Sequence, residues 1–515
     1  MDDARRATPT WARYALLILG TAATLFAVGG RWDIPLAAWI SPVLLLRFAR
    51  TGRAWSATPW ILLANLAAAV FWIDESAMGF NVVIIAGAAG LSLLQTLPFL
   101  LDRLLVGRLR PWMSVLTFPA AAAGSEFLIT LLSPFGTAYG SRAVTQYGDL
   151  PLLQVTSIIG SYGIGFLIAW AASAVNRFWE RPSWRSARSA VVYGAVLSTV
   201  LLGGGARLAF SQGGTTVRIA GVSPGREATD ALQAALQRIP GGRRDVAAAP
   251  PSAVRPAMAA VENDLLATTR REAEAGARIV VWPEEGVKTL EADEPTAITR
   301  AREEARRSGV YLEIGLGVYS TTAPAYGRDE AVFIGPDGRV LWTYQKAHPI
   351  PGSETFTPGD GHVPVVDTPY GRIANVICYD ADFPDLMRVR ADIMLVPAHD
   401  WREYGRAHTE KAALRAIEGG YALVRQDADG LSAAFDDRGH VLAATDYFTT
   451  DRQTTVADVP THGATTVYDV VGDAFAWLCL LAVAALTVIG LARPYRPEPA
   501  RVSPPLRSAP AEPVS

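Results

Sequence analysis

The most constraining feature of this chain is a series of long apolar stretches, each close to the length that crosses a lipid bilayer. A membrane-spanning helix needs about 20 mostly apolar residues, and it must be helical because the bilayer interior offers the backbone no other hydrogen-bonding partner. We predict eight such helices, at 13–30, 34–49, 58–74, 80–101, 112–133, 151–176, 189–209 and 474–492. Residues 1–210 would form a seven-helix membrane domain, and residues 471–493 would contain the eighth helix.

The arginines in the short loops predict how these helices are oriented. Cytoplasmic loops of membrane proteins are enriched in Lys and Arg. Arginine-rich loops alternate along the chain, at 47–53, 103–110 and 177–188, and further arginines follow the last stretch. The pattern predicts that both termini are cytoplasmic and that the long polar segment is extracytoplasmic. We expect the tail at 494–515, rich in Pro, Arg and Ser, to be disordered.

The charge balance excludes some functions. The chain has 515 residues, 47 basic and 49 acidic side chains and a formal net charge of −2. It therefore presents no basic face, and we predict that it does not bind nucleic acid. Of its two cysteines, Cys378 lies in the polar segment and Cys479 in the last apolar stretch, so a bridge between them is not expected. A free thiol outside the cytoplasm is tolerated mainly where it is used.

Residues 211–470 have the pattern of a mixed α/β domain. Short β-branched runs alternate with helical stretches near 260–275, 295–308, 384–391 and 407–419. The turns GPDG at 335–338 and DDRG at 436–439 each predict a β-hairpin. The segment 224–256, rich in Ala, Pro and Gly, indicates a long loop with at most one helix.

Three residues at the ends of predicted strands form a set that suits acyl transfer. Cys378 ends the run IANVIC before a turn into a helix, where a thiolate is stabilised, although a buried core cysteine would show the same pattern. Glu284 and Lys346 each follow a strand, and either alone is more typical of a solvated loop charge. Together, a base, a cation and a thiol can deprotonate the nucleophile, stabilise an oxyanion and hold an acyl group.

Histidines offer a competing interpretation. His348 beside Lys346 could suggest a Cys–His pair, and His399 or His408 could suggest a metal site. No His or Cys lies three to five residues from them with the spacing of a zinc site. We therefore predict that these histidines are loop or packing residues.

The order of three motifs resembles the nitrilase, or carbon–nitrogen hydrolase, superfamily. These motifs are WPE at 282–284, YQK at 344–346 and CYD at 378–380. The resemblance implies an αββα sandwich with Glu284 as general base, Lys346 as oxyanion stabiliser and Cys378 as nucleophile. An eight-helix membrane domain joined to such a sandwich, with SPFGTAYG at 133–140, resembles the apolipoprotein N-acyltransferase family within it.

That resemblance implies an enzyme of the bacterial cytoplasmic membrane. It would move an acyl chain from a phospholipid, through a Cys378 thioester, to the α-amine of a diacylglyceryl-cysteine apolipoprotein. Glu354 and Tyr379 match supporting residues of the family. The resemblance implies no metal or organic cofactor.

The sequence departs from this family in ways that leave alternatives open. HDWREYGRAH at 399–408 replaces the usual Asn-Asp pair and Trp-Phe-Gly, so the loop 398–406 is divergent. In addition, Asp380 stands where Glu is common, and the segment 224–256 is long. A membrane-tethered amidase acting on a small amide, or a scaffold with an inactive domain, are the competing hypotheses.

Overall fold

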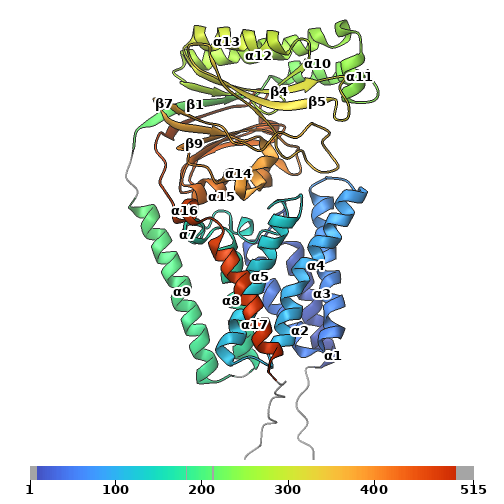
Figure 1. Ribbon diagram of the computed structural model, residues 1–515, viewed down its shortest axis with the longest axis vertical. Helices are drawn as coiled ribbons and strands as arrows, with labels where there is room; N and C mark the ends of the chain where they lie inside the picture. The colour runs from blue at the N-terminus through green and yellow to red at the C-terminus, as the bar shows by residue number, and fades with distance from the viewer. Residues whose placement is uncertain (1–8, 181, 211–213, 494–515) are drawn as a thin grey trace, which may run out of the picture.

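A computed structural model describes residues 9–180, 182–210 and 214–493 of the chain (Figure 1). Helices form one half of the molecule and two stacked sheets form the other. The helix α1 begins, and the helix α17 ends, at the end of the helical half that lies far from the sheets (Figure 1). The predicted disordered tail, 494–515, lies outside the described residues.

Each predicted apolar stretch contains helix. The long helices of this half are α1 (Thr10–Leu25), α2 (Pro35–Thr51), α3 (Ala54–Glu75), α4 (Val82–Leu105), α5 (Pro111–Leu132), α8 (Tyr162–Glu180), α9 (Trp184–Ala209) and α17 (Ala474–Leu491). Within the described residues, five of them are long and apolar enough to cross a membrane, namely α3, α4, α5, α9 and α17. The number of candidate spans rises to six if the bent pair Leu150–Ile159 and Tyr162–Glu180 counts as one span. The helices α1 and α2, of 16 and 17 residues, are shorter.

The apolar surface of this half supports a membrane location. Side chains such as Leu202 on α9 and Trp477 and Leu481 on α17 are more than half exposed. Water would disfavour so much contiguous apolar surface, whereas lipid would not. The chain therefore has the character of a membrane protein.

The sixth stretch is not the single helix that we predicted. It forms α6 (Leu150–Leu153) and α7 (Thr156–Ile159), and the segment from Leu150 to Ile159 is bent by 115° from α8. Gly160 follows α7 with φ +71°, a conformation that favours glycine, and a β-carbon there would lie 2.7 Å from the Tyr468 ring. The bend brings Ser161 N within 2.7 Å of Glu418 Oε1 in the sheet-containing half. Packing against that half has thus overridden a continuous helix.

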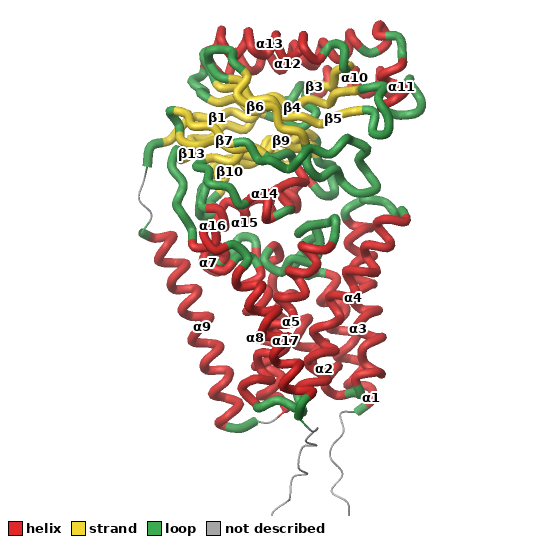
Figure 2. The backbone as a smooth tube through the Cα atoms, viewed as in Figure 1, coloured by secondary structure: helices red, strands yellow, loops and turns green. Residues whose placement is uncertain are grey.

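A seven-stranded sheet and a six-stranded sheet lie face to face in the other half (Figure 2). The first has the order β13-β1-β2-β4-β5-β6, with β3 also paired to β4, and the second has the order β12-β11-β10-β9-β8-β7. The strands are β1 (Thr216–Val222), β2 (Ile279–Val281), β3 (Val287–Leu290), β4 (Tyr311–Tyr319), β5 (Gly327–Ile334), β6 (Val340–Gln345), β7 (Val365–Thr368), β8 (Gly371–Asn375), β9 (Ile393–His399), β10 (Ala422–Ala428), β11 (Leu431–Phe435), β12 (Val441–Asp446) and β13 (Thr454–Pro460). Both predicted hairpins are confirmed, since β5 pairs antiparallel with β6 and β11 with β12.

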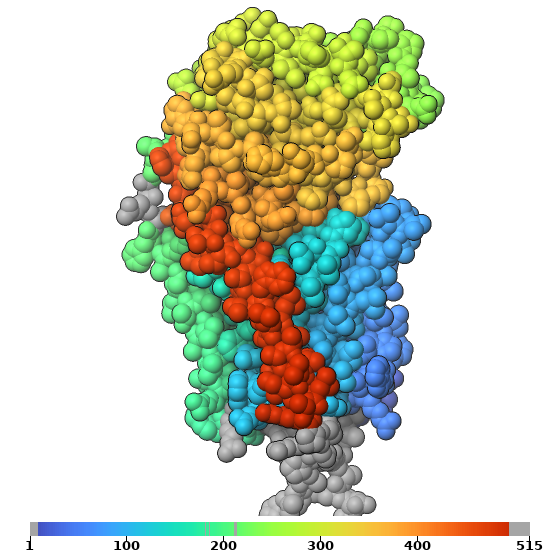
Figure 3. Space-filling model, viewed as in Figure 1, coloured from blue at the N-terminus to red at the C-terminus, as the bar shows by residue number. Residues whose placement is uncertain are grey.

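Helices cover both outer faces of the sheet pair. Above the first sheet lie α10 (Arg226–Gln237), α11 (Arg243–Ala248), α12 (Arg255–Glu274) and α13 (Glu294–Ser308); below the second lie α14 (Pro384–Met387), α15 (Gly405–Gly419) and α16 (Val467–Val471). Ile219 and Phe333 of the first sheet meet Leu395 and Val424 of the second in a buried apolar layer. The result is the expected αββα sandwich, and it packs directly on the helical half (Figure 3).

Two local predictions need correction. The segment 224–256 is not a long loop, since it contains the α-helices α10 and α11, whose Leu232 and Val246 make buried contacts against the first sheet. The helix expected at 384–391 ends at Met387.

Candidate active site

The candidate site lies at the ends of strands from both sheets. Glu284 follows β2, Lys346 follows β6 and Cys378 follows β8 by three residues. Their side chains are almost completely buried, with 2%, 0% and 0% of their surface exposed. The fold therefore gathers all three predicted residues in one enclosed place.

Lys346 is the centre of the charged cluster. Its Nζ donates hydrogen bonds to Glu284 Oε1 at 2.6 Å and to both Glu354 oxygens at 2.9 and 2.8 Å. Asp329 Oδ2 lies 3.8 Å away. The structure thus places Glu354 in this cluster, and it adds Asp329, which sequence reasoning missed.

Cys378 occupies a turn with an uncommon backbone conformation. It begins the 3-10 turn Cys378–Asp382, and its φ is +46°, which a residue with a β-carbon rarely adopts. The Sγ atom contacts the His399 carbonyl oxygen at 3.9 Å and Arg425 Nη2 at 3.8 Å. Surrounding contacts must hold such a conformation in place.

Asp380 supplies much of that support. Its carboxylate accepts hydrogen bonds from the Tyr344 hydroxyl at 2.8 Å and from the backbone N–H groups of Ala347 and His348 at 3.2 and 2.8 Å. These donors flank Lys346 in the chain. Asp380 therefore ties the lysine segment to the nucleophile turn.

Burial and neighbouring charges shift the pKa values of Glu284, Lys346 and Cys378. Burial by itself would raise the pKa of Glu284, but the Lys346 ammonium holds that pKa below its ordinary value. Burial would lower the pKa of Lys346, but Glu284 and then Glu354 hold it well above its ordinary value. Burial, followed by the Glu284 carboxylate, raises the pKa of the Cys378 thiol well above its usual range. The resting site thus holds a carboxylate, an ammonium and a protonated thiol.

Tyr379 faces the membrane half rather than the charged cluster. Its hydroxyl donates to the Pro134 carbonyl oxygen at 3.2 Å, and its ring meets Phe383 edge-on at 5.4 Å. Thr137, from the same segment as Pro134, donates to Asp382 Oδ1 at 3.0 Å. The segment 133–140 therefore braces the turn that carries Cys378.

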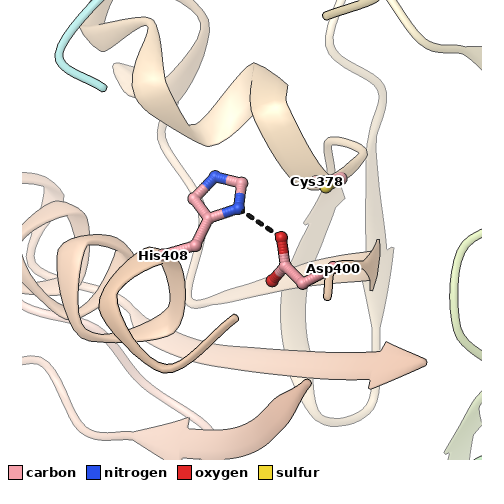
Figure 4. Close-up of side chains that lie close together, drawn as sticks. All are labelled: Cys378, Asp400 and His408. Atoms are coloured by element: carbon pink, nitrogen blue, oxygen red, sulfur yellow. Dashed lines mark hydrogen bonds and ion pairs between the residues drawn. The ribbon is translucent and has the colours of Figure 1, made fainter. Parts of the chain in front are cut away.

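A second cluster lies on the other side of Cys378 (Figure 4). Ligand atoms of Cys378, Asp400 and His408 all lie within 4.8 Å of one another, a spacing that a metal ion could use. Arg425 Nη2, however, lies 2.8 Å from Asp400 Oδ2 and 2.9 Å from His408 Nδ1. A guanidinium cation therefore already occupies this space.

The histidines differ from one another. His408 is a buried residue of α15, and its two ring nitrogens face Asp400 at 2.7 Å and Asp382 at 3.1 Å. It therefore belongs to an ionic network and does more than pack. His399 Nε2 lies 3.3 Å from Asp429 Oδ2, and it lines a cavity of about 40 Å³ that also borders Glu284.

Arg425 is a second residue of this site, after Asp329, that sequence reasoning missed. It lies on β10 within the run ALVRQDA and has no exposed surface. Lysine and arginine are almost never fully buried unless paired. A charged residue inside an otherwise apolar strand is the signal that could have identified it.

Comparisons with known proteins agree with both halves of the molecule. The carbon-nitrogen hydrolase family matches residues 246–468, and the apolipoprotein N-acyltransferase N-terminal domain matches residues 16–174. Deaminated glutathione amidase of Yersinia enterocolitica is 34% identical over 134 residues, which are 23% of this chain and 46% of that protein. A crystal structure of an amidase from Nesterenkonia sp. is 20% identical, with a TM-score of 0.37, over 49% of this chain and 94% of that one.

Two relatives span most of the chain. Apolipoprotein N-acyltransferase of Geobacter metallireducens is 26% identical over 423 residues, which are 74% of this chain and 74% of that protein. Apolipoprotein N-acyltransferase of Rhizobium leguminosarum bv. trifolii is 24% identical over 451 residues, 77% of this chain and 79% of that protein. Since the family matches cover both the helical half and the sandwich, the chain belongs to the apolipoprotein N-acyltransferase family.

Proposed function

We propose that this protein transfers an acyl chain from a membrane phospholipid to the N-terminal α-amine of a diacylglyceryl-cysteine apolipoprotein. The observation that carries the proposal is the buried cluster of Glu284, Lys346 and Cys378, set above a layer of membrane helices. Its relatives that span both halves carry the same activity in their names. Both substrates are lipids, so an enzyme anchored in their bilayer meets them at a high local concentration.

In the first half-reaction, Cys378 takes the acyl chain. The Glu284 carboxylate accepts the thiol proton, and Sγ forms a bond to the ester carbonyl carbon. The Lys346 ammonium stabilises the resulting oxyanion. The carbon–oxygen bond then breaks, the proton passes from Glu284 to the departing lysophospholipid oxygen, and a thioester remains.

In the second half-reaction, the acceptor amine takes the chain. Its nitrogen attacks the thioester carbonyl carbon, Glu284 accepts the proton from that nitrogen, and the carbon–sulfur bond breaks. The sulfur regains the proton and an amide is released. Glu354 keeps Lys346 in place through both steps, and Tyr379 keeps the turn of Cys378 against the membrane half.

The arrangement in the membrane is part of the proposal. Eight helices would cross the bilayer, with residues 1–210 and 471–493 forming the membrane domain and residues 211–470 the extracytoplasmic catalytic domain. Both termini would be cytoplasmic. The alternation of arginine-rich loops supports this orientation, as does the position of the α1 start and α17 end on one side.

An amidase with water as the acceptor would use the same three residues. It would have no need for the helical half, because a small soluble amide does not enter from the bilayer. The match of residues 16–174 to the N-terminal domain of the acyltransferase family therefore favours the transferase.

The test is to detect the thioester. Purified full-length protein in detergent is incubated with phospholipid, and intact mass is compared for wild type, Cys378→Ser, Cys378→Ala and Cys479→Ala. We expect an acyl adduct in wild type and Cys479→Ala, absent in Cys378→Ala, and removed by neutral hydroxylamine. A synthetic diacylglyceryl lipopeptide should then become N-acylated. Hydrolysis of small amides without any acyl adduct would instead support the amidase.

A further inference from the structure

Arg425 touches Cys378 at two points. Its Nη1 donates to the Cys378 carbonyl oxygen at 3.3 Å, and its Nη2 lies 3.8 Å from Sγ. The arginine has no exposed surface. One planar cation therefore contacts both the backbone and the thiol of the same residue.

Two carboxylates hold the Arg425 guanidinium in this position. Nη2 donates to Asp400 Oδ2 at 2.8 Å, and Nε lies 3.8 Å from Asp427 Oδ2. Asp400 is fixed in turn by His408, whose Nδ1 lies 2.7 Å away. If Arg425 moved away, a buried carboxylate would lose its cation, which is strongly unfavourable.

The two cations near Cys378 differ in what they contact. The Lys346 ammonium donates its hydrogen bonds to Glu284 and Glu354, whereas Arg425 Nη2 lies 3.8 Å from Sγ. When Cys378 loses its proton, negative charge develops on Sγ in a site with almost no exposed surface. A fixed cation is worth far more in such a site than in water.

We propose that Arg425 is a further catalytic residue, which stabilises the Cys378 thiolate as it forms and holds the strained turn that presents it. The proposal rests on the proposed function only in taking Cys378 as the nucleophile. Lys346 then stabilises the oxyanion, and Arg425 stabilises the negative charge on Sγ. The forked guanidinium is required because a lysine ammonium cannot contact the carbonyl oxygen and Sγ together while keeping Asp400.

The experiment measures how readily Cys378 is alkylated as pH changes. Full-length protein in detergent carries Cys479→Ala, so that one thiol remains, and Glu284→Gln, so that the proposed general base cannot take the thiol proton. Iodoacetamide alkylation is followed by intact mass. The charged or titratable groups that face Sγ are then Lys346, Asp400, His408 and Arg425, and Arg425→Gln replaces only the last of them.

We expect Arg425→Gln to raise the pH midpoint of alkylation by about one unit, which makes alkylation about tenfold slower at neutral pH. Arg425→Lys should raise the midpoint by less, because it keeps the charge and loses the two-point contact. The matched control is Arg415→Gln, which removes another buried arginine, paired with Glu418 on α15. Its midpoint should not move.

An unchanged midpoint in folded Arg425→Gln would overturn the proposal. Circular dichroism melting establishes that each variant is folded. If Arg425→Gln does not fold, the pH midpoint of alkylation is compared between Arg425→Lys and the parent protein. An unchanged midpoint in Arg425→Lys would also overturn the proposal. Alkylation needs no lipid, so this result is separate from the success or failure of acyl transfer.

Discussion

Thr137 of the membrane half donates a hydrogen bond of 3.0 Å to Oδ1 of Asp382, which lies four residues after Cys378. A second bond, from Thr137 N to the Asp382 carbonyl oxygen, measures 2.8 Å. The membrane half therefore does more than anchor the sandwich, since it holds the turn of the nucleophile directly.

Gly136→Ala should weaken the contact between the two halves. Gly136 has φ +52°, and a β-carbon there would lie 2.4 Å from the Asp382 carbonyl oxygen. The clash should push segment 133–140 away from the nucleophile turn, lower the melting temperature and slow acyl-enzyme formation. Gly148→Ala is the control, because Gly148 has φ +93° with open space around it. Equal effects of the two variants would show that backbone strain alone is responsible.

Glu354→Gln should slow acyl-enzyme formation while the protein stays folded. The carboxylate holds Lys346 with two hydrogen bonds and accepts a third from Ile350 N at 2.9 Å. The amide keeps the shape but loses the charge that fixes the ammonium, and we expect a rate loss of about 10- to 100-fold. The rate of adduct formation by intact mass measures this loss. Glu303→Gln, on the exposed face of α13, should leave the rate unchanged.

Asp380→Glu should destabilise the protein even though it keeps the carboxylate. Asp380 has no exposed surface and its carboxylate already accepts several hydrogen bonds. An extra methylene in such a site costs about 1–3 kcal/mol. Thermal melting measures the loss. Asp385→Glu, on the exposed side of α14, is the control, and an equal melting temperature for both variants would contradict the prediction.

The rate of acyl-enzyme formation should change little with pH across the neutral range. Glu284 has a lowered pKa, so its base function is lost only as pH falls below the ordinary range of a glutamic acid. Lys346 has a raised pKa, so its charge is lost only as pH rises above the ordinary range of a lysine. Rates measured at constant detergent and lipid should therefore form a broad plateau. A rate that climbs steadily through the ordinary titration range of a thiol would instead indicate that Cys378 reacts as a thiolate formed beforehand.

The sequence by itself predicted the elements whose physical signal is local. Long apolar stretches must be helical in a bilayer, and alternating β-branched runs favour strands, so the helical half and the sandwich followed from hydropathy and periodicity. The order of Glu284, Lys346 and Cys378 at strand ends was equally local, and the structure brings these residues together.

Tertiary structure decided what depends on contacts between distant segments. The bend at Gly160 arises from packing against Tyr468, which lies about 300 residues away in the chain. Arg425 came to Cys378 because β10 pairs with β9, and Thr137 reached Asp382 only because the two halves pack together. Periodicity carries no information about which strand becomes the neighbour of another. The contact of Arg425 with Cys378 and the hydrogen bond from Thr137 to Asp382 therefore depend on the assembled fold. Glu284, Lys346 and Cys378, in contrast, could be identified along the chain.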